Sequence, residues 1–194
     1  DQFNRETDVP RKLRSLLTLY TINGADESLL VPLLRSSEEH LRTWAIRLLT
    51  ENWPLDALLT NDEIPAGADA WRNPPVGVRF VQQRPAPAVG GAEVNPPQNI
   101  IAEFSRMAVE DSSSLVRLVL ASTMQRMPFA LRPHIAAGLV SHAEDATDKN
   151  LPLMVWWALI PLAEKFPSAL VDVAVKSELR ATRKYITRRL AEDI

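Results

Sequence analysis

Apolar residues recur at intervals of three and four along most of the chain, which is the spacing of one face of an α-helix. The clearest case lies between Ser36 and Pro54, where the apolar positions are Leu41, Trp44, Ala45, Leu48 and Leu49 and the outward positions are Glu38, Glu39, Arg42, Arg47 and Glu51. The pattern also predicts helices over residues 9–22, 27–35, 98–110, 115–127, 134–143, 152–160, 167–175 and 178–192. Glycine is scarce, at 6 residues. We therefore expect an all-α fold with little strand.

Turn and cap residues separate these helices. Gly24 is expected to end the first helix in the left-handed conformation, which costs glycine little. Asp26 is placed to cap the second helix, and Ser36 with Glu39 has the spacing of a capping box. Asp148 or Asn150 can cap the helix that follows them.

A tryptophan-rich helix follows residue 150. Pro152 suits a first helical turn, and residues 153–160 form an unbroken apolar run. A helix that is apolar on every side is expected to be buried on every side. Pro161 should kink or end this helix near Trp157, because proline removes a hydrogen bond and crowds the preceding turn. Trp156 and Trp157 then either pack in the core or form an aromatic platform for a ligand.

Residues 61–97 break the helical pattern with repeated prolines and glycines. We predict a long Pro-rich insertion within a single helical domain that spans residues 1–194. A loop of this length is either disordered and draped on the surface or used for interaction. Residues 76–82 can form a short strand within it, and residues 1–8, which are polar, are expected to fray.

A hydrophobic-Arg dipeptide recurs in the helices, as Leu13-Arg14, Leu41-Arg42, Val116-Arg117 and, with threonine in the first position, Thr182-Arg183. The first three copies keep a period typical of helical hairpins once the insertion is subtracted. The stretch DSSSLVRLVLA at residues 111–121 resembles the start of the second helix of HEAT repeats. The resemblance implies an α-α superhelix, a HEAT- or armadillo-like solenoid, in which such an arginine stays at the solvated edge and binds a neighbouring loop.

A closer resemblance covers the C-terminal half. Val116-Arg117, Ala121-Ser122 and HAEDATDKNLPLMVWW at residues 142–157 are similar to the HEAT-like segment of large multidomain proteins from planctomycete- and verrucomicrobium-type bacteria. That segment typically lies between a sugar-dehydrogenase-like propeller and a c-type cytochrome module with a CxxCH motif. The resemblance implies a periplasmic or exported parent protein. Those proteins often carry Glu before the proline of the tryptophan helix, whereas this chain has Ile160.

The amino-acid composition excludes several kinds of site and partner. Cysteine is absent, which excludes disulfides, thiolate metal sites and covalent haem attachment from these residues, so neither haem nor any other cofactor is assigned to the segment. The net charge of −2 gives no global attraction to nucleic acid or membrane, and no apolar run approaches the length of a membrane span. Because residue 1 is Asp, we expect the chain to be a fragment or a processed segment.

The polar turn at residues 144–150 is the part of the sequence that best fits a metal or catalytic site. His142 with Glu144, Asp145 and Asp148 offers oxygen and nitrogen ligands, but lacks the ordered spacing and central glycine of an EF-hand loop. Helix capping explains these residues without a metal, so we predict no metal site and no catalytic residues. An enzyme with its site in this turn remains the alternative.

The last helix carries Arg180, Arg183, Lys184 and Arg188, a local excess of positive charge. These residues, with Trp156 and Trp157, form the interaction surface that the sequence suggests. We expect a non-catalytic scaffold or spacer domain of a larger, exported redox protein, which binds neighbouring domains of its own polypeptide or another protein. Nucleic-acid binding through the basic helix is the second alternative.

Overall fold

The computed structural model describes residues 2–53 and 96–192, and the regular structure within these residues is entirely helical, which confirms the all-α prediction. The predicted insertion at residues 61–97 and the strand at 76–82 lie outside the described residues, except for Pro96 and Pro97. The helices are α1 (Gln2–Arg5), α2 (Val9–Thr21), α3 (Glu27–Leu33), α4 (Glu39–Thr50), α5 (Gln98–Glu110), α6 (Ser114–Thr123), α7 (Arg132–Leu139), α8 (Leu151–Leu159), α9 (Leu162–Lys165), α10 (Pro167–Lys176) and α11 (Arg180–Glu192). Short 3₁₀ turns span Met124–Arg126 and Ala143–Thr147.

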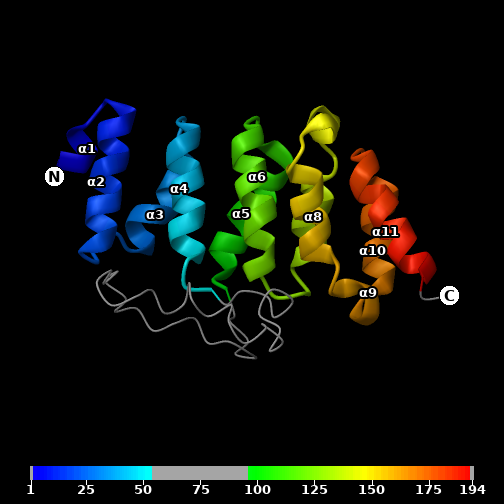
Figure 1. The fold of residues 1–194 in the computed structure, drawn as a ribbon. Coiled ribbons are helices and arrows are strands. Elements are labelled where there is room, and N and C mark those ends of the chain that lie inside the picture. Colours follow the sequence, from blue (N-terminus) through cyan, green and yellow to red (C-terminus); the bar gives the residue numbers. More distant parts are fainter. Residues whose placement is uncertain (1, 54–95, 193–194) are drawn as a thin grey trace, which may run out of the picture.

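The helices stand side by side in a row that runs from the N-terminus to the C-terminus (Figure 1). One layer contains α2, α4, α6, α8 and α11, in which each helix packs against the next. A second layer contains α3, α5, α7 and α10, of which α7 packs against both α5 and α10. Consecutive helices pair across the layers as α3–α4, α5–α6, α7–α8 and α10–α11. The chain is thus a row of helical hairpins, each in contact with its neighbours.

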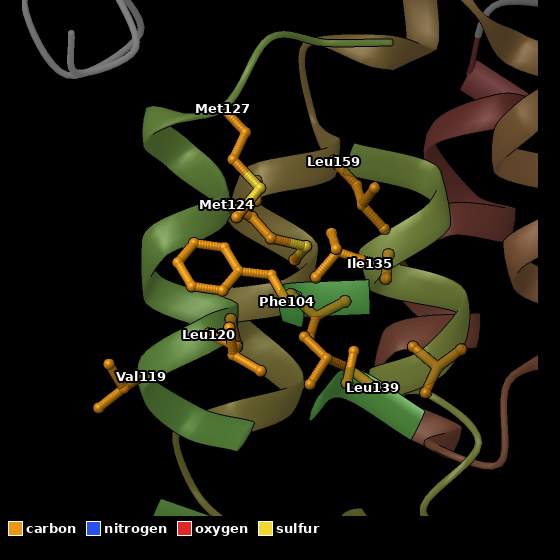
Figure 2. Close-up of a cluster of buried hydrophobic side chains, with 14 of the residues drawn as sticks. Phe104, Val119, Leu120, Met124, Met127, Ile135, Leu139 and Leu159 are labelled. Atoms are coloured by element: carbon orange, nitrogen blue, oxygen red, sulfur yellow. The ribbon is translucent and has the colours of Figure 1, made fainter. Parts of the chain in front are cut away.

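The main hydrophobic core lies between the two layers. Figure 2 shows its centre, where Phe104 of α5 and Leu120 of α6 meet Ile135 and Leu139 of α7 and Leu159 of α8. All five side chains are fully buried. Side chains from four consecutive helices therefore share one core, as expected when neighbouring hairpins bury each other's apolar faces.

A second core cluster lies at the N-terminal end and corrects one prediction. Phe3, from the residues expected to fray, is only 3% exposed and packs in a cluster with Leu16, Leu30 and Leu41. The ammonium group of Lys12 also lies 5.1 Å from the Phe3 ring centre. The buried Phe3 ring thus attaches the short helix α1 to this cluster.

Helix α4 is buried more widely than its amphipathic pattern indicates. Leu41, Ala45 and Leu48 are buried as predicted. Ile46 and Thr43 are buried as well, because α4 lies between α3 on one side and α6 on the other. A helix inside a row is buried on the two sides that contact its neighbours, whereas a single amphipathic stripe predicts only one buried side.

Helix α2 ends in a Schellman motif, in which Asn23 takes the left-handed role predicted for Gly24. Asn23 has φ 58°, and the Gly24 N–H donates to the Leu19 carbonyl at 2.7 Å while the Asn23 N–H donates to the Tyr20 carbonyl at 3.0 Å. Asparagine tolerates this conformation better than most residues. The prediction failed because both residues of the Asn-Gly pair are suited to the position.

Of the other predicted N-caps, some are present in the structure and one is not. Asp26 caps α3 as predicted, accepting a hydrogen bond from the Leu29 N–H. The capping box of Ser36 and Glu39 is wrong, because Glu38 precedes α4 and the Ser36 hydroxyl accepts from the Glu38 N–H at 3.2 Å instead. Asp148 holds the start of α8 by accepting from the Leu151 N–H at 2.7 Å.

The close approach of α5 and α7 gives a prediction. A Cβ atom at Gly138 would lie 2.9 Å from the Ala108 Cβ and 3.0 Å from the Val109 Cγ2, so the two helices must move apart to admit it. Gly138→Ala should lower the free energy of unfolding by about 1–3 kcal/mol, measured by urea denaturation. Gly24→Ala is the control, because its Cβ would have no neighbour closer than 3.4 Å. Equal midpoints for the two variants would contradict the packing.

Candidate interaction surfaces

Arginine side chains bind each hairpin to the next in the centre of the row. Arg42 is the fourth residue of α4, and its guanidinium donates to both carboxylate oxygens of Asp111 at 2.8 and 2.9 Å. The same guanidinium donates to the carbonyl of Ser36, six residues earlier, at 2.8 Å. Asp111 lies at the end of α5, so this contact fixes the α3–α4 hairpin to the α5–α6 hairpin.

Arg117 repeats this arrangement one hairpin further along. It is the fourth residue of α6 and donates to the two carboxylate oxygens of Asp145 at 2.5 and 2.7 Å, and to the Asp111 carbonyl, again six residues earlier, at 2.7 Å. Hydrogen bonding from Asp145 raises the pKa of Arg117 above its ordinary value. The expected contact with a neighbouring loop is present, but the expected solvated position is wrong, because Arg117 is only 2% exposed.

The polar turn after α7 is occupied by structural contacts. Besides the Asp145 pair, Glu144 accepts from His142 Nδ1 at 3.0 Å and lies 3.3 Å from Arg117. The other ring nitrogen of His142 contacts the Ala108 carbonyl at 3.0 Å, which joins this turn to α5. A backbone hydrogen bond and the His142 side chain lower the pKa of Glu144. Among residues 2–53 and 96–192, no three metal-ligating side chains gather into a possible metal site.

The four basic residues singled out by the sequence lie together. Arg180, Arg183, Lys184 and Arg188 are exposed on α11 and, with Thr187, line one shallow depression. Arg183, the fourth residue of α11, also donates to the carbonyl of Ser177, six residues earlier. It therefore repeats the backbone contact of Arg42 and Arg117.

The two tryptophans of α8 have different environments. Trp156 is half-buried and stacks on Tyr185 of α11, with ring centres 6.0 Å apart and planes 20° from parallel. Trp157 is 47% exposed, so the prediction that α8 is buried on every side is wrong. Helices α6, α7 and α11 cover α8 on three sides, and Trp157 projects on the open one. The helix ends at Leu159, just before Pro161, as the proline predicts.

A groove across α4, α6 and α8 was not predicted. Its volume is about 520 Å³, and its lining includes Trp44, Leu118, Ser122, Arg126 and Met154. The guanidinium of Arg47 lies over the Trp44 ring at 5.3 Å, and Arg126 donates to the Trp53 carbonyl at 2.8 Å. The sequence does contain a signal for this groove. Leu115, Leu118 and Ser122 are spaced i, i+3, i+7 and so share one face of α6, which differs from the face of the core residues.

No protein-family model matches this chain, and no curated protein or solved structure is significantly similar to it. Within the described residues, every helix is too short or too polar to cross a membrane. The interaction surfaces therefore rest on geometry alone.

Removing Asp145 should destabilise the centre of the row. Asp145→Ala leaves the Arg117 guanidinium buried without its carboxylate, and we expect a loss of about 3–5 kcal/mol in the free energy of unfolding, measured by chemical denaturation. Arg35→Ala is the control, because the Arg35–Glu103 pair lies on the surface with Arg35 68% exposed, and its loss should barely move the midpoint. Similar losses in both variants would refute the central role of the buried pair.

Proposed function

We propose that this chain is a HEAT-like α-solenoid that acts as a non-catalytic interaction scaffold. The observation that carries the proposal is the groove across α4, α6 and α8, because it is built from three consecutive hairpins and exists only in their assembled row. Stacked hairpins create such extended surfaces from helices that cannot bury their faces alone.

The chemistry of the groove suits a protein partner. Trp44, Leu118 and Met154 are each half-buried, so apolar area remains for a partner to cover. Arg47 and Glu51 supply charges of both signs at its edge. Tryptophan and arginine are the residues that most often dominate binding energy at protein interfaces.

The setting of this scaffold is a further part of the proposal. The resemblance of residues 142–157 supports a spacer between domains of a larger, exported redox protein, with neighbouring domains of the same polypeptide or another protein as partners. If the chain were an enzyme with its site at residues 144–150, the carboxylates of this turn would be its catalytic groups. However, Asp145 pairs with Arg117, and Asp148 accepts a hydrogen bond at the start of α8. These structural contacts favour the scaffold.

Filling the groove tests the scaffold. Ser122 is exposed on α6 within the groove, so Ser122→Tyr should block a partner without removing any core side chain. Affinity capture from a lysate of the source organism, quantified by mass spectrometry, should show partners reduced at least about tenfold against wild type. Ser168→Tyr, the same change at an exposed serine of α10, is the control and should keep them. Identical capture by all three proteins would contradict the proposal.

Nucleic-acid binding is the second candidate, and the depression lined by Arg180, Arg183, Lys184 and Arg188 is the observation that favours it. Non-specific DNA binding of this kind has a dissociation constant of about 10⁻⁴–10⁻⁶ M and weakens steeply with salt. If this candidate holds, Lys184→Glu should weaken binding of a fluorescent DNA duplex in an anisotropy titration at low salt. If DNA binding is undetectable, or is unchanged by the substitution, nucleic-acid binding is excluded and the protein-interaction scaffold is the one proposal that stands.

A further inference from the structure

The layer that contains α4, α6, α8 and α11 has an outer face, which points away from the core between the two layers (Figure 1). A residue two positions after a buried one lies about 200° around the helix from it. Each of the four helices has a fully buried residue followed two positions later by an outer one, and the pairs are Ala45 and Arg47, Leu120 and Ser122, Val155 and Trp157, and Thr182 and Lys184. Because the buried members turn inward, the outer members share one face.

The middle of this outer face is apolar. Leu118 of α6 and Met154 of α8 are half-buried in the groove described above. Trp157 follows Met154 by one helical turn and is 47% exposed. Since α6 and α8 pack against each other, their axes are about 8–10 Å apart, and the three side chains form one apolar strip.

Basic residues flank the apolar strip on both sides. Arg47 lies on one side and Lys184 on the other, because α4 packs on α6 and α11 packs on α8. Among the described residues, no carboxylate forms an ion pair with Arg47 or Lys184. The outer face is therefore positive, although the chain as a whole has a net charge of −2. The linings of the groove and of the basic depression on α11 together hold six basic side chains and one acid, which are Arg47, Arg126, Arg180, Arg183, Lys184 and Arg188 against Glu51.

The polar groups of the groove offer little to the backbone of an extended peptide. The hydroxyls of Thr50 and Thr123 donate to the carbonyls of Ile46 and Val119, four residues earlier in their own helices, at 2.8 Å each. An extended peptide would bury N–H and C=O groups here without partners, whereas a helix satisfies its own. The groove therefore favours a helical occupant, of the kind that lays its apolar side into a groove.

The width of the outer face sets the length of that occupant. Three helix–helix contacts separate α4 from α11 in this layer, so their axes are about 24–30 Å apart. A helix of about 18 residues is about 27 Å long. We propose, on the basis of the scaffold function above, that its partner is an acidic amphipathic helix lying across α4, α6, α8 and α11. The apolar side of the partner covers Leu118, Met154 and Trp157, and its acidic side chains reach Arg47 at one end and Lys184 at the other.

The apolar strip separates this partner from duplex DNA. A duplex binds cations through its phosphates, and it would contact the basic residues of α11 without covering Leu118 and Met154. The acidic helix needs α4 as well as α11, so Arg47 is the residue that distinguishes the two partners.

Selection from random peptides tests the chemistry of the partner. The whole chain is immobilised and used to select from a phage-displayed library of random peptides of about 18 residues. The selected peptides should contain Asp and Glu at least about twice as often as the unselected library, because both flanks of the strip are basic. Their apolar residues should recur at i, i+3 or i+4, and i+7.

Single charge reversals then locate the bound peptide. Arg47→Glu and Lys184→Glu should each weaken binding of a fluorescein-labelled selected peptide by about three- to tenfold in an anisotropy titration. Lys176→Glu makes the same charge change at an exposed residue of α10, in the other layer, and should bind like wild type. A copy of the peptide with lysine in place of each acid should bind the Arg47→Glu, Lys184→Glu double variant and not wild type, a gain that damage to the fold cannot imitate.

The outcomes separate this partner from the scaffold itself. Selected peptides that have no excess of acids but lose binding in Ser122→Tyr would overturn the acidic partner and leave the groove in use. Peptides that bind Ser122→Tyr as tightly as wild type would contradict the groove and the acidic partner together. A selection that yields no binding peptide would overturn the acidic partner. An effect of Lys184→Glu without any effect of Arg47→Glu would do so as well, and is the result expected if α11 binds nucleic acid alone.

Discussion

The buried guanidinium of Arg117 is the contact on which the centre of this structure depends. Removing an arginine from water is expensive, and the cost is offset only when excellent geometry satisfies the group. Arg117 meets this condition with two bonds to the Asp145 carboxylate and one to the Asp111 carbonyl. Because Asp111 in turn binds Arg42, three hairpins share one connected polar network. Loss of one member would leave a charge buried without its partner.

Apolar packing supplies most of the attraction between the hairpins, and the polar network sets their register. The core of Figure 2 places side chains from α5 to α8 together, and such contacts are not directional. The bidentate Arg42–Asp111 and Arg117–Asp145 pairs are directional, since a planar guanidinium can donate two parallel hydrogen bonds to a carboxylate in few orientations. The close contact of Gly138 with Ala108 then fixes how near α5 and α7 can lie. Together these constraints align α4, α6 and α8 so that a groove runs across them.

Helical periodicity predicted nearly every element of the described residues, because an amphipathic helix records its own inward side in the sequence. It could not predict what depends on neighbours. Phe3 is a lone aromatic in a polar segment, and its burial is decided by Leu16 and Leu30 far along the chain. Trp157 is exposed because three helices cover α8 and leave one side open. The basic residues of α11 were found from their local excess of positive charge. The groove at Trp44 was missed because its residues come from three hairpins, and the positions of α6 that line it indicate a groove only once the neighbouring helices are in place.

The arginines show where sequence information ends. Arg42, Arg117 and Arg183 share a helix position, and the start of each helix alone brings a carbonyl six residues earlier within reach. The carboxylate is different, because it comes from the adjacent hairpin and exists only where a hairpin follows in space. One sequence pattern therefore gives a bound arginine inside the row and an exposed one at its end. A carboxylate accepts two parallel hydrogen bonds from a guanidinium, whereas a carbonyl accepts only one from it here, so Arg42 and Arg117 are held more firmly than Arg183.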